Sequence, residues 1–337
     1  MNKKSFLGKI MALTLGSIIM GLGACTPIKK GEYASGSATI YCDDGFKNIL
    51  EEEIEVFEFT YPQASIIPFF VSEGEAIDTF MNDGTQAIIT TRELTKEQIQ
   101  YMRSKFKRVV RQQCIAVDAV ALIANKNNPV SALSMDQISD ILNGKITRWD
   151  QLAGNDTTQI KLIFDNAESS TVTYLKDKFL PEGQSIAEKT NAYAQQNNAQ
   201  VFDVVKTDPN ALGIISVSWL GDDLTAAKKV PVDKRMEDYE NQNDTIATNL
   251  TTEVNIIKVS NPTQDNDYNL VSYAPYQAYI YSGDYPLVRK VYMISSASNS
   301  TVLHSFYVYV TGFVGQKIIS KTGILPYQMH PRVVQVI

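Results

Sequence analysis

Residues 161–179 read KLIFDNAESSTVTYLKDKF, a stretch that passes from an apolar run through a short polar loop into a second apolar pattern. The run Lys161–Phe164 predicts a strand, and Val172, Leu175 and Phe179 recur at the spacing of one helical face. Strands that lead into helices are the units of parallel sheets covered by helices. This stretch therefore predicts an α/β fold.

The same alternation continues on both sides of this stretch. Further strands are predicted at Ala38–Tyr41, Ser65–Val71, Ala87–Thr90, Cys114–Asn125 and Leu212–Ser216. Two predicted helices open with capping-box spacing, at Thr95-Lys96-Glu97-Gln98 and at Ser134-Met135-Asp136-Gln137. Residues 232–270 are instead polar and rich in Asn and Asp, which indicates an insertion or a loop-bearing hairpin.

The N-terminus has the pattern of a secretory signal. Three lysines precede an apolar stretch from Ile10 to Leu22, which is followed by Gly23, Ala24 and Cys25. The apolar run is too short and too interrupted to be a good membrane-spanning helix. The alternatives are an ordinary signal peptide with a chance Cys, or a short membrane anchor.

Leu-Gly-Ala-Cys is similar to the bacterial lipobox, whose cysteine is diacylated and becomes the mature N-terminus. We therefore predict a signal peptide over residues 1–24, a lipid on Cys25 and a flexible tether over residues 25–36. Two acyl chains hold a protein stably at a membrane. The expected location is extracytoplasmic, on the periplasmic side of a membrane.

The charge of the chain limits its partners. Removal of residues 1–24 would take the net charge from −6 to −9, because three lysines and no acids are lost. Such an acidic surface argues against nucleic acid, which needs clustered Lys and Arg. A small anion can still be held by local dipoles. The remaining chain of about 310 residues is long enough for two domains, and no other stretch has the length and apolarity of a membrane span.

Cysteine and histidine give little sign of a metal site. Cys42 and Cys114 lie beside predicted strands and are interpreted as two buried thiols in preference to a disulfide. His304 and His330 have no ligand spacing around them, so we expect no metal and no cofactor.

The polar loop of the opening stretch is a candidate anion site. Ser169, Ser170 and Thr171 place three hydroxyls at the start of a predicted helix, beside free backbone N–H groups and the positive end of the helix dipole. Helix capping alone explains one such hydroxyl. Three together keep both a capping role and a ligand role open.

Several longer motifs resemble one family over nearly the whole chain after the signal. Residues 142–152, LNGKITRWDQL, are similar to a GKITxWxxL segment of the phosphate-binding lipoproteins of the Pst-type phosphate importer. Residues 115–123, 211–214, 285–289, 315–318 and 323–326 also fit that family. The resemblance implies a two-lobe type II periplasmic-binding-protein fold, in which each lobe is a mostly parallel sheet flanked by helices and the ligand lies between the lobes.

The resemblance also implies a ligand site. In the family a Ser-Gly-Thr at a helix N-terminus grips the phosphate, and residues 169–171 occupy its place. Loops of the first lobe contribute the remainder, which here implies Asp44, Gly45, Phe46 and Ser72. Arg92 is a further candidate as an anion clamp, with a salt bridge to Glu73, Glu93 or Asp118 as the alternative.

Two positions depart from the family pattern. The family Arg that precedes the Thr by six residues falls on Asp165, and the Asp that accepts the phosphate proton falls on Gln86. The first loop has become Asp43-Asp44-Gly45. Carboxylates facing a phosphate dianion repel it unless they are protonated or paired. The resemblance therefore supports an inference about the fold better than an inference about the ligand.

These observations define a working division of the chain. We expect lobe 1 to hold residues 36–117 and 276–337, and lobe 2 residues 118–275. The expected function is capture of an oxyanion, by default phosphate, and its delivery to the permease and ATPase subunits of an ABC importer by a monomeric binding protein. The alternative is a sensor or accessory binding lipoprotein of the same fold with an altered ligand.

An enzyme is the weakest alternative. Ser104-Lys105-Phe106-Lys107 matches Ser-x-x-Lys, and Lys321-Thr322-Gly323 matches a Lys-Thr-Gly motif of penicillin-interacting enzymes. No Ser-Asp-Asn triplet lies between them, and three-letter matches arise by chance. We therefore expect no catalytic residues.

Overall fold

The computed structural model describes residues 34–153, 157–189, 191–221, 229–241, 249–260 and 271–328. Within these ranges the strands are β1 (Gly36–Asp43), β2 (Ala64–Val71), β3 (Ala87–Thr90), β4 (Arg111–Ala124), β5 (Ala132–Ser134), β6 (Lys161–Phe164), β7 (Ala192–Ala194), β8 (Ala211–Ser216), β9 (Asn255–Ser260), β10 (Ser272–Tyr273), β11 (Val288–Ser295) and β12 (Leu325–Pro326).

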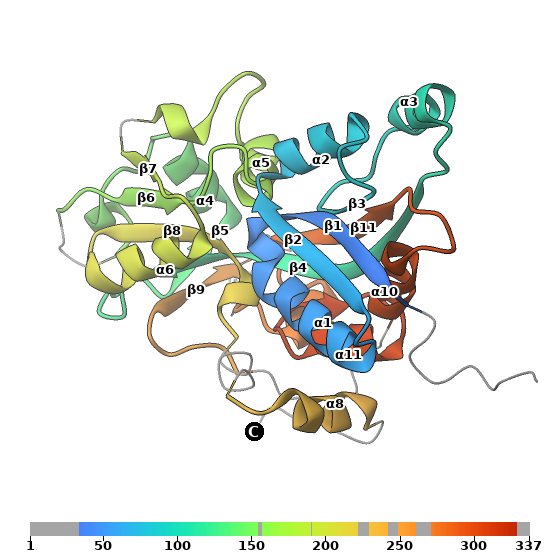
Figure 1. Ribbon diagram of the computed structural model, residues 1–337. Coiled ribbons are helices and arrows are strands. Elements are labelled where there is room, and N and C mark those ends of the chain that lie inside the picture. Colours follow the sequence, from blue (N-terminus) through green and yellow to red (C-terminus); the bar gives the residue numbers. More distant parts are fainter. Residues whose placement is uncertain are drawn as a thin grey trace, which may run out of the picture.

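The α-helices of the same ranges alternate with these strands (Figure 1). They are α1 (Lys47–Thr60), α2 (Glu73–Met81), α3 (Lys96–Phe106), α4 (Met135–Leu142), α5 (Ser170–Phe179), α6 (Asn198–Thr207), α8 (Val232–Glu240), α9 (Gln277–Ser282), α10 (Val302–Thr311) and α11 (Phe313–Ser320). Short 3-10 helices include η1 (Asp44–Phe46), directly after β1, and η4 (Val217–Trp219), directly after β8.

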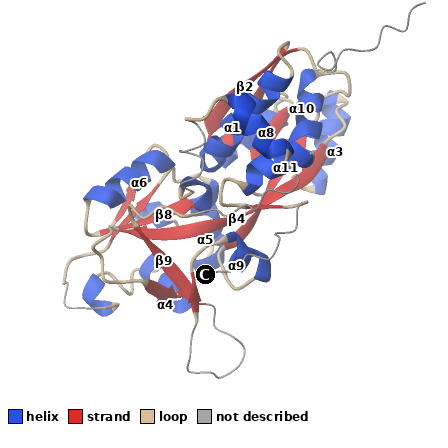
Figure 2. Ribbon diagram, turned by 90° about the horizontal axis from the view of Figure 1, so that it is seen from below, coloured by secondary structure: helices blue, strands red, loops and turns tan. Residues whose placement is uncertain are grey.

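The strands form two sheets that share β4. The order β2-β1-β3-β11-β4 makes the first sheet, and β4-β8-β6-β7 makes the second, with β9 also paired to β4. Figure 2 shows β4 running from one group of helices and strands to the other. The two-lobe α/β fold is thereby confirmed, with each lobe built on one sheet.

The parallel pairing expected for each lobe is found in its outer strands. β1 pairs in parallel with β2 and β3, and β6 pairs in parallel with β7 and β8. β4 and β11 pair antiparallel to each other because β4 takes the chain from the first lobe to the second and β11 belongs to its return. Both are largely buried and accordingly read as nearly continuous apolar runs.

The segment 142–152, which resembles the family motif, contributes a buried tryptophan to the second lobe. Trp149 is fully buried in the second lobe, and its indole N–H donates to the backbone oxygen of Asn210 at 3.2 Å. Both predicted capping boxes form, at Thr95 before α3 and at Ser134 before α4. These local signals fix helix starts in both lobes.

Helix α8 comes from the polar stretch 232–270, which the sequence predicts to belong to lobe 2. It packs against α1 and α11 of the first lobe (Figure 2). Its Arg235 forms a buried ion pair with Glu52 and a second with Glu55, where Nη2 lies 2.9 Å from Oε1. β9 of this stretch pairs antiparallel with β10, which follows the stretch, as in a hairpin. The boundaries 36–117, 118–275 and 276–337 remain a prediction.

Cys42 and Cys114 are both buried and free, in agreement with the interpretation as thiols. Cys25 and the segment 1–33 lie outside the described residues. Within the described ranges, no helix is both long enough and apolar enough to cross a bilayer.

Candidate functional site

Polar side chains from both lobes meet where several strands end. β1 ends at Asp43 in the first lobe, β6 ends one residue before Asp165 in the second, and Arg289 is the second residue of β11. Open α/β sheets bind ligands at such carboxyl ends of strands. We call the following residues the cleft cluster, each at most 6 % exposed: Asp43, Asp165, Ser169, Ser170, Thr171 and Arg289.

The three predicted hydroxyls have three different roles. Ser169 is the N-cap of α5, since its Oγ accepts from the N–H of Val172 at 3.3 Å. Ser169 Oγ and Thr171 Oγ1 both donate to Asp165 Oδ1, at 2.5 and 3.0 Å. Ser170 instead faces the other lobe. Ser169 therefore caps the helix, Thr171 holds Asp165, and Ser170 lies between the lobes.

Ser170 offers an anion two donors at the helix start. Its backbone N–H donates to Asp43 Oδ2 at 3.2 Å, and its Oγ donates to Asp43 Oδ1 at 2.8 Å. The positive end of the α5 dipole adds to the attraction for negative charge. A carboxylate of the first lobe is thus held by the helix start of the second.

Arg289 supplies the positive charge of the cleft cluster. Its Nη1 donates to Ser170 Oγ at 2.9 Å and its Nε donates to Asp118 Oδ2 at 2.9 Å. Its guanidinium also lies over the ring of Phe46, 5.4 Å from the centroid. Arg289 on β11 thus contacts both Asp118 on β4 and Ser170 at the start of α5.

The sequence contained a signal for Arg289 that the prediction did not use. Asp118 and Arg289 each interrupt an apolar strand, and neither charge can be buried alone. Two such anomalies in one chain suggest a pair. Asp43 was likewise absent from the predicted ligand residues, although it adjoins Asp44 in the same loop.

Asp44 makes the second contact between the lobes. Its Oδ2 accepts from the backbone N–H and from Nδ2 of Asn198, both at 3.1 Å. Asn198 is the first residue of α6, and its Nδ2 also donates to Asp165 Oδ2 at 3.0 Å. Two consecutive carboxylates of lobe 1 therefore meet two helix starts of lobe 2.

Burial determines the charge state of the cleft cluster. It raises the pKa of Asp43 to about 6, against the opposing effect of the Arg289 guanidinium. Burial, followed by the neighbouring charge of Asp43, raises the pKa of Asp165 to about 7. Burial also raises the pKa of Asp118, its ion pair with Arg289 notwithstanding. The carboxyl groups outnumber the single guanidinium, so their protonation lowers the net negative charge of the cleft cluster.

Gly45 permits the close approach of these groups. Its N–H donates to Asp43 Oδ1 at 3.0 Å, and its carbonyl accepts from Ser218 Oγ at 2.7 Å. A Cβ on Gly45 would lie 2.8 Å from Asp43 Oδ1. The absence of a side chain here leaves room for the Asp43 carboxylate, which the Gly45 N–H holds.

Other predicted ligand residues lie at the edge of this arrangement or beyond it. Ser72 is the N-cap of α2 and accepts from the N–H of Glu75. Arg92 forms an ion pair with Glu73, Nε to Oε2 at 3.3 Å, and its side chain is 56 % exposed. This contact is the salt bridge to Glu73 that the sequence left open as the alternative role of Arg92.

The structure corrects the placement of Gln86. Strand β3 runs parallel to β1, with Ile89 opposite Cys42, so Asp43 is level with Thr90. Gln86 precedes β3 and lies roughly 13 Å back along the strand, at about 3.3 Å per residue. Its amide lies beside Arg108. Gln86 therefore takes no place in the cleft cluster.

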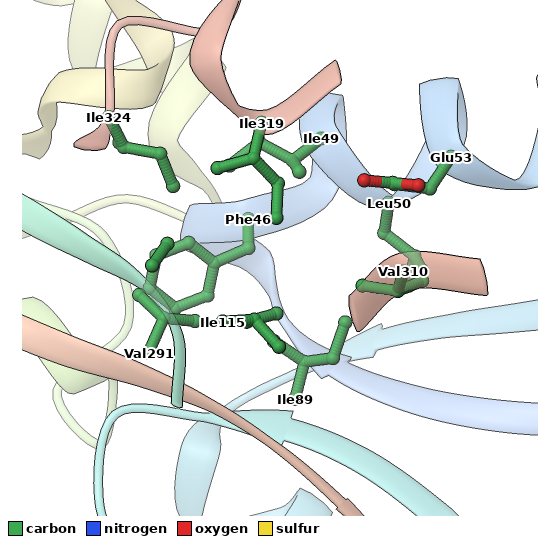
Figure 3. A pocket seen from close by; sticks show the side chains of 11 residues that line it. Phe46, Ile49, Leu50, Glu53, Ile89, Ile115, Val291, Val310, Ile319 and Ile324 are labelled. Carbon is green, nitrogen blue, oxygen red and sulfur yellow. The ribbon is translucent and has the colours of Figure 1, made fainter. Parts of the chain in front are cut away.

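Figure 3 shows a small, mostly apolar cavity in the first lobe, separate from the polar groups of Asp43 and Ser170. Apart from the Glu53 carboxyl, the side chains around it are apolar, among them Phe46 and Ile115, and its volume is only about 10 Å³. That space holds at most one water molecule. Phe46 thus uses its side chain in the core and under Arg289 rather than in a ligand pocket.

The residues that match enzyme motifs are not part of the cleft cluster. Ser104 lies in α3 and donates to the carbonyl of Tyr101, while Thr322 follows α11 and donates to the carbonyl of Ile319. Among the described residues no group of three His, Cys, Asp or Glu is placed to hold a metal ion. His330 lies outside the described residues.

The chain is similar in sequence to phosphate-binding proteins of several bacteria. Over 346 residues, 95 % of each chain, this protein is 21 % identical to the phosphate-binding protein PstS of Pseudomonas aeruginosa. It is 24 % identical to PstS of Borreliella burgdorferi over 149 residues, 42 % of this chain and 50 % of that relative.

Solved structures share the fold. A Clostridium perfringens protein, described as a phosphate ABC transporter substrate-binding protein and solved with bound phosphate, aligns with a TM-score of 0.66 at 22 % identity, over 87 % of this chain and 100 % of that one. An ABC-type phosphate transport receptor from Vibrio cholerae aligns with a TM-score of 0.58 at 18 % identity, over 86 % of this chain and 100 % of that one. The family model of the PBP superfamily domain matches residues 29–314, most of the chain. This protein belongs to the PBP superfamily.

Proposed function

We propose that this protein captures phosphate between its two lobes and delivers it to the membrane subunits of an ABC importer. One observation carries the proposal. The N–H and hydroxyl of Ser170 at the start of α5 both donate to the Asp43 carboxyl group of the other lobe, and Arg289 Nη1 donates to the same hydroxyl. The names of the relatives, which bind or transport phosphate, support this choice of anion.

The cleft must open for a ligand to enter. Ser170 and Asp43 are each 1 % exposed, and Thr171 is fully buried. Binding proteins of two lobes open by hinge motion. Here the connection that would bend is β4, which pairs with β11 in one sheet and with β8 in the other.

Protonation of the carboxyl groups would let an oxyanion enter this acidic site. Asp43 and Asp165 have raised pKa values, about 6 and about 7, so part of each is neutral near neutral pH. A neutral carboxyl group can donate a hydrogen bond to a phosphate oxygen, where a carboxylate repels it. The same function places the protein on the extracytoplasmic side, where the predicted lipid on Cys25 would hold it near its permease.

Calorimetric titration tests this function. Phosphate, sulfate and an organophosphate are added to phosphate-free protein at pH 6.5, with Ser170→Ala and Ser104→Ala measured in parallel. We expect phosphate binding in the wild type and a loss of roughly tenfold in affinity for Ser170→Ala, the value of one charge-assisted hydrogen bond. Ser104→Ala is the matched control, because Ser104 is exposed on α3 and its hydroxyl donates to the carbonyl of Tyr101 in the same helix. No heat with any oxyanion contradicts the proposal.

A further inference from the structure

Asp43 contacts the start of α5 in the manner of a bound anion. We propose that the Asp43 carboxylate is an internal competitor of the ligand, which occupies the oxyanion position and must be displaced before phosphate binds. The inference rests on the proposed function and names the residue that sets the affinity of that site.

The contacts of Asp43 are those that an oxyanion would use. Its Oδ1 accepts from Ser170 Oγ at 2.8 Å and from the N–H of Gly45 at 3.0 Å, and its Oδ2 accepts from the N–H of Ser170 at 3.2 Å. A backbone N–H, a hydroxyl and a helix start together form an anion site. The carboxylate reaches the two Ser170 donors from the opposite lobe, 127 residues away in sequence.

An oxyanion and the Asp43 carboxylate cannot use these donors together. Each N–H and O–H of Ser170 carries one hydrogen, and both hydrogens already point at Asp43. The surroundings are closed, with Asp43 and Ser170 each 1 % exposed. Ligand binding therefore requires that the carboxylate leave or lose its charge.

Arg289 retains donor capacity for the incoming anion. Its Nη2 is buried and lies 2.8 Å from Asp118 Oδ2, but no described acceptor is aligned with the Nη2 hydrogens. Nη2 also lies 3.6 Å from the point where a Cβ on Gly45 would be. A buried guanidinium nitrogen whose hydrogens are not aligned with its carboxylate neighbour, beside the Asp43 loop, is where an exchanged oxyanion would gain a contact that Asp43 does not make.

Asp44 explains how the lobes could stay together during the exchange. It holds the start of α6 through Asn198, independently of Asp43. Displacement of Asp43 thus breaks one of these two carboxylate contacts between the lobes and leaves the other.

The charges that face Asp43 determine how the competition varies with pH. They come from the adjoining loop, β11, α2 and the loop before α5, and comprise Asp44, Arg289, Glu73 and Asp165. The pKa of Asp43 is raised to about 6, so the carboxylate is a strong competitor at pH 8 and a weaker one below pH 6.

Titration of phosphate into three proteins at pH 8 and pH 5.5 tests the proposal. They are the wild type, Asp43→Asn, which keeps the shape and removes the charge, and Asp150→Asn, which removes a partly buried charge that is paired with Arg148 and lies outside the cleft cluster. We expect Asp43→Asn to bind phosphate about tenfold more tightly than wild type at pH 8, as for a competing state populated about nine times in ten. We expect a smaller gap at pH 5.5, and Asp150→Asn to match the wild type.

Two results overturn the proposal. If the wild type binds phosphate and Asp43→Asn binds equally or more weakly, Asp43 is no competitor and the proposed function stands. If neither protein binds phosphate, the function fails as well. Asp43→Ser provides a second variant with the same expected gain, because a serine oxygen can still accept from the N–H of Gly45 and preserve the loop.

Discussion

Asp165 is a buried carboxyl group whose neighbours are mostly hydroxyls and an amide, and this makes the stability of the ligand-free protein depend on pH. Its pKa is raised by burial and by Asp43 from 3.8 to about 7. Between these two pH values the folded state binds more protons than the unfolded state. The stability that this group contributes is therefore fully present below about pH 4 and is lost as the pH rises through about 7.

Replacement of Asp165 by Asn tests this dependence. In phosphate-free buffer we expect the free energy of unfolding of the wild type to fall between pH 5 and pH 8, by at most about 1.4 kcal/mol for each pH unit below the folded-state pKa. Asp165→Asn should show a much flatter profile, measured by urea unfolding. Asp150→Asn should keep the wild-type slope. An unchanged slope in Asp165→Asn would mean that this carboxyl is not the titrating group.

At the scale of single residues, local patterns in the sequence predicted only half of the site. The hydroxyls at 169–171 were found because a helix start has a local signature. Asp43 and Arg289 were missed because their contacts with Ser170 join residues 127 and 119 positions apart, which no local pattern records. Arg289 is a charged residue in a mostly buried strand, which indicates that it has a partner, but the sequence pattern does not show which residue that partner is.

Helix α8 is the element whose place in the fold the sequence did not reveal. Its residues are mostly polar, and its apolar face is short: Val232, Met236 and Tyr239 pack in a cluster with Val56 and Ile318. Buried polar contacts add to this packing. Arg235 pairs with Glu52, and Tyr239 donates to Glu52 Oε1 at 2.9 Å. The side chains of Arg235 and Glu52 are 5 % and 0 % exposed.

Removal of Arg235 should leave Glu52 as an uncompensated buried charge. We expect Arg235→Met to lower the free energy of unfolding by about 3–5 kcal/mol, measured by urea unfolding. The double variant Arg235→Met with Glu52→Gln should recover part of that loss. Lys234→Met is the matched control, since Lys234 is 60 % exposed and should change stability by less than about 1 kcal/mol. Equal effects at positions 234 and 235 would contradict a role for α8 in fastening the first lobe.

Strands and capped helices were predicted well because their signals are local. The expected strand at 114–125 is β4, found at Arg111–Ala124, and both capping boxes form. The expected strand Ala38–Tyr41 proved longer, since β1 continues to Asp43. The strand ends on a polar residue, so an apolar pattern could not mark the point where the site begins.

At the scale of the whole molecule, the fold places one lobe's acidic loop against the other lobe's helix starts. β4 belongs to both sheets, and the contacts of Asp43 and Asp44 cross between the lobes on the side where strands end. The two-lobe architecture was implied by the family resemblance and is confirmed. The meeting of these particular groups depends on how the lobes close, which composition and periodicity do not encode.

A crystal structure of the protein at saturating phosphate would test phosphate capture at the start of α5 without any intermediate assumption. We predict phosphate within hydrogen-bond distance of the Ser170 N–H and Oγ and of the Arg289 guanidinium, with the Asp43 carboxylate moved off these donors. Phosphate bound elsewhere, or an unoccupied α5 start with Asp43 still bonded to Ser170, would contradict capture at this site.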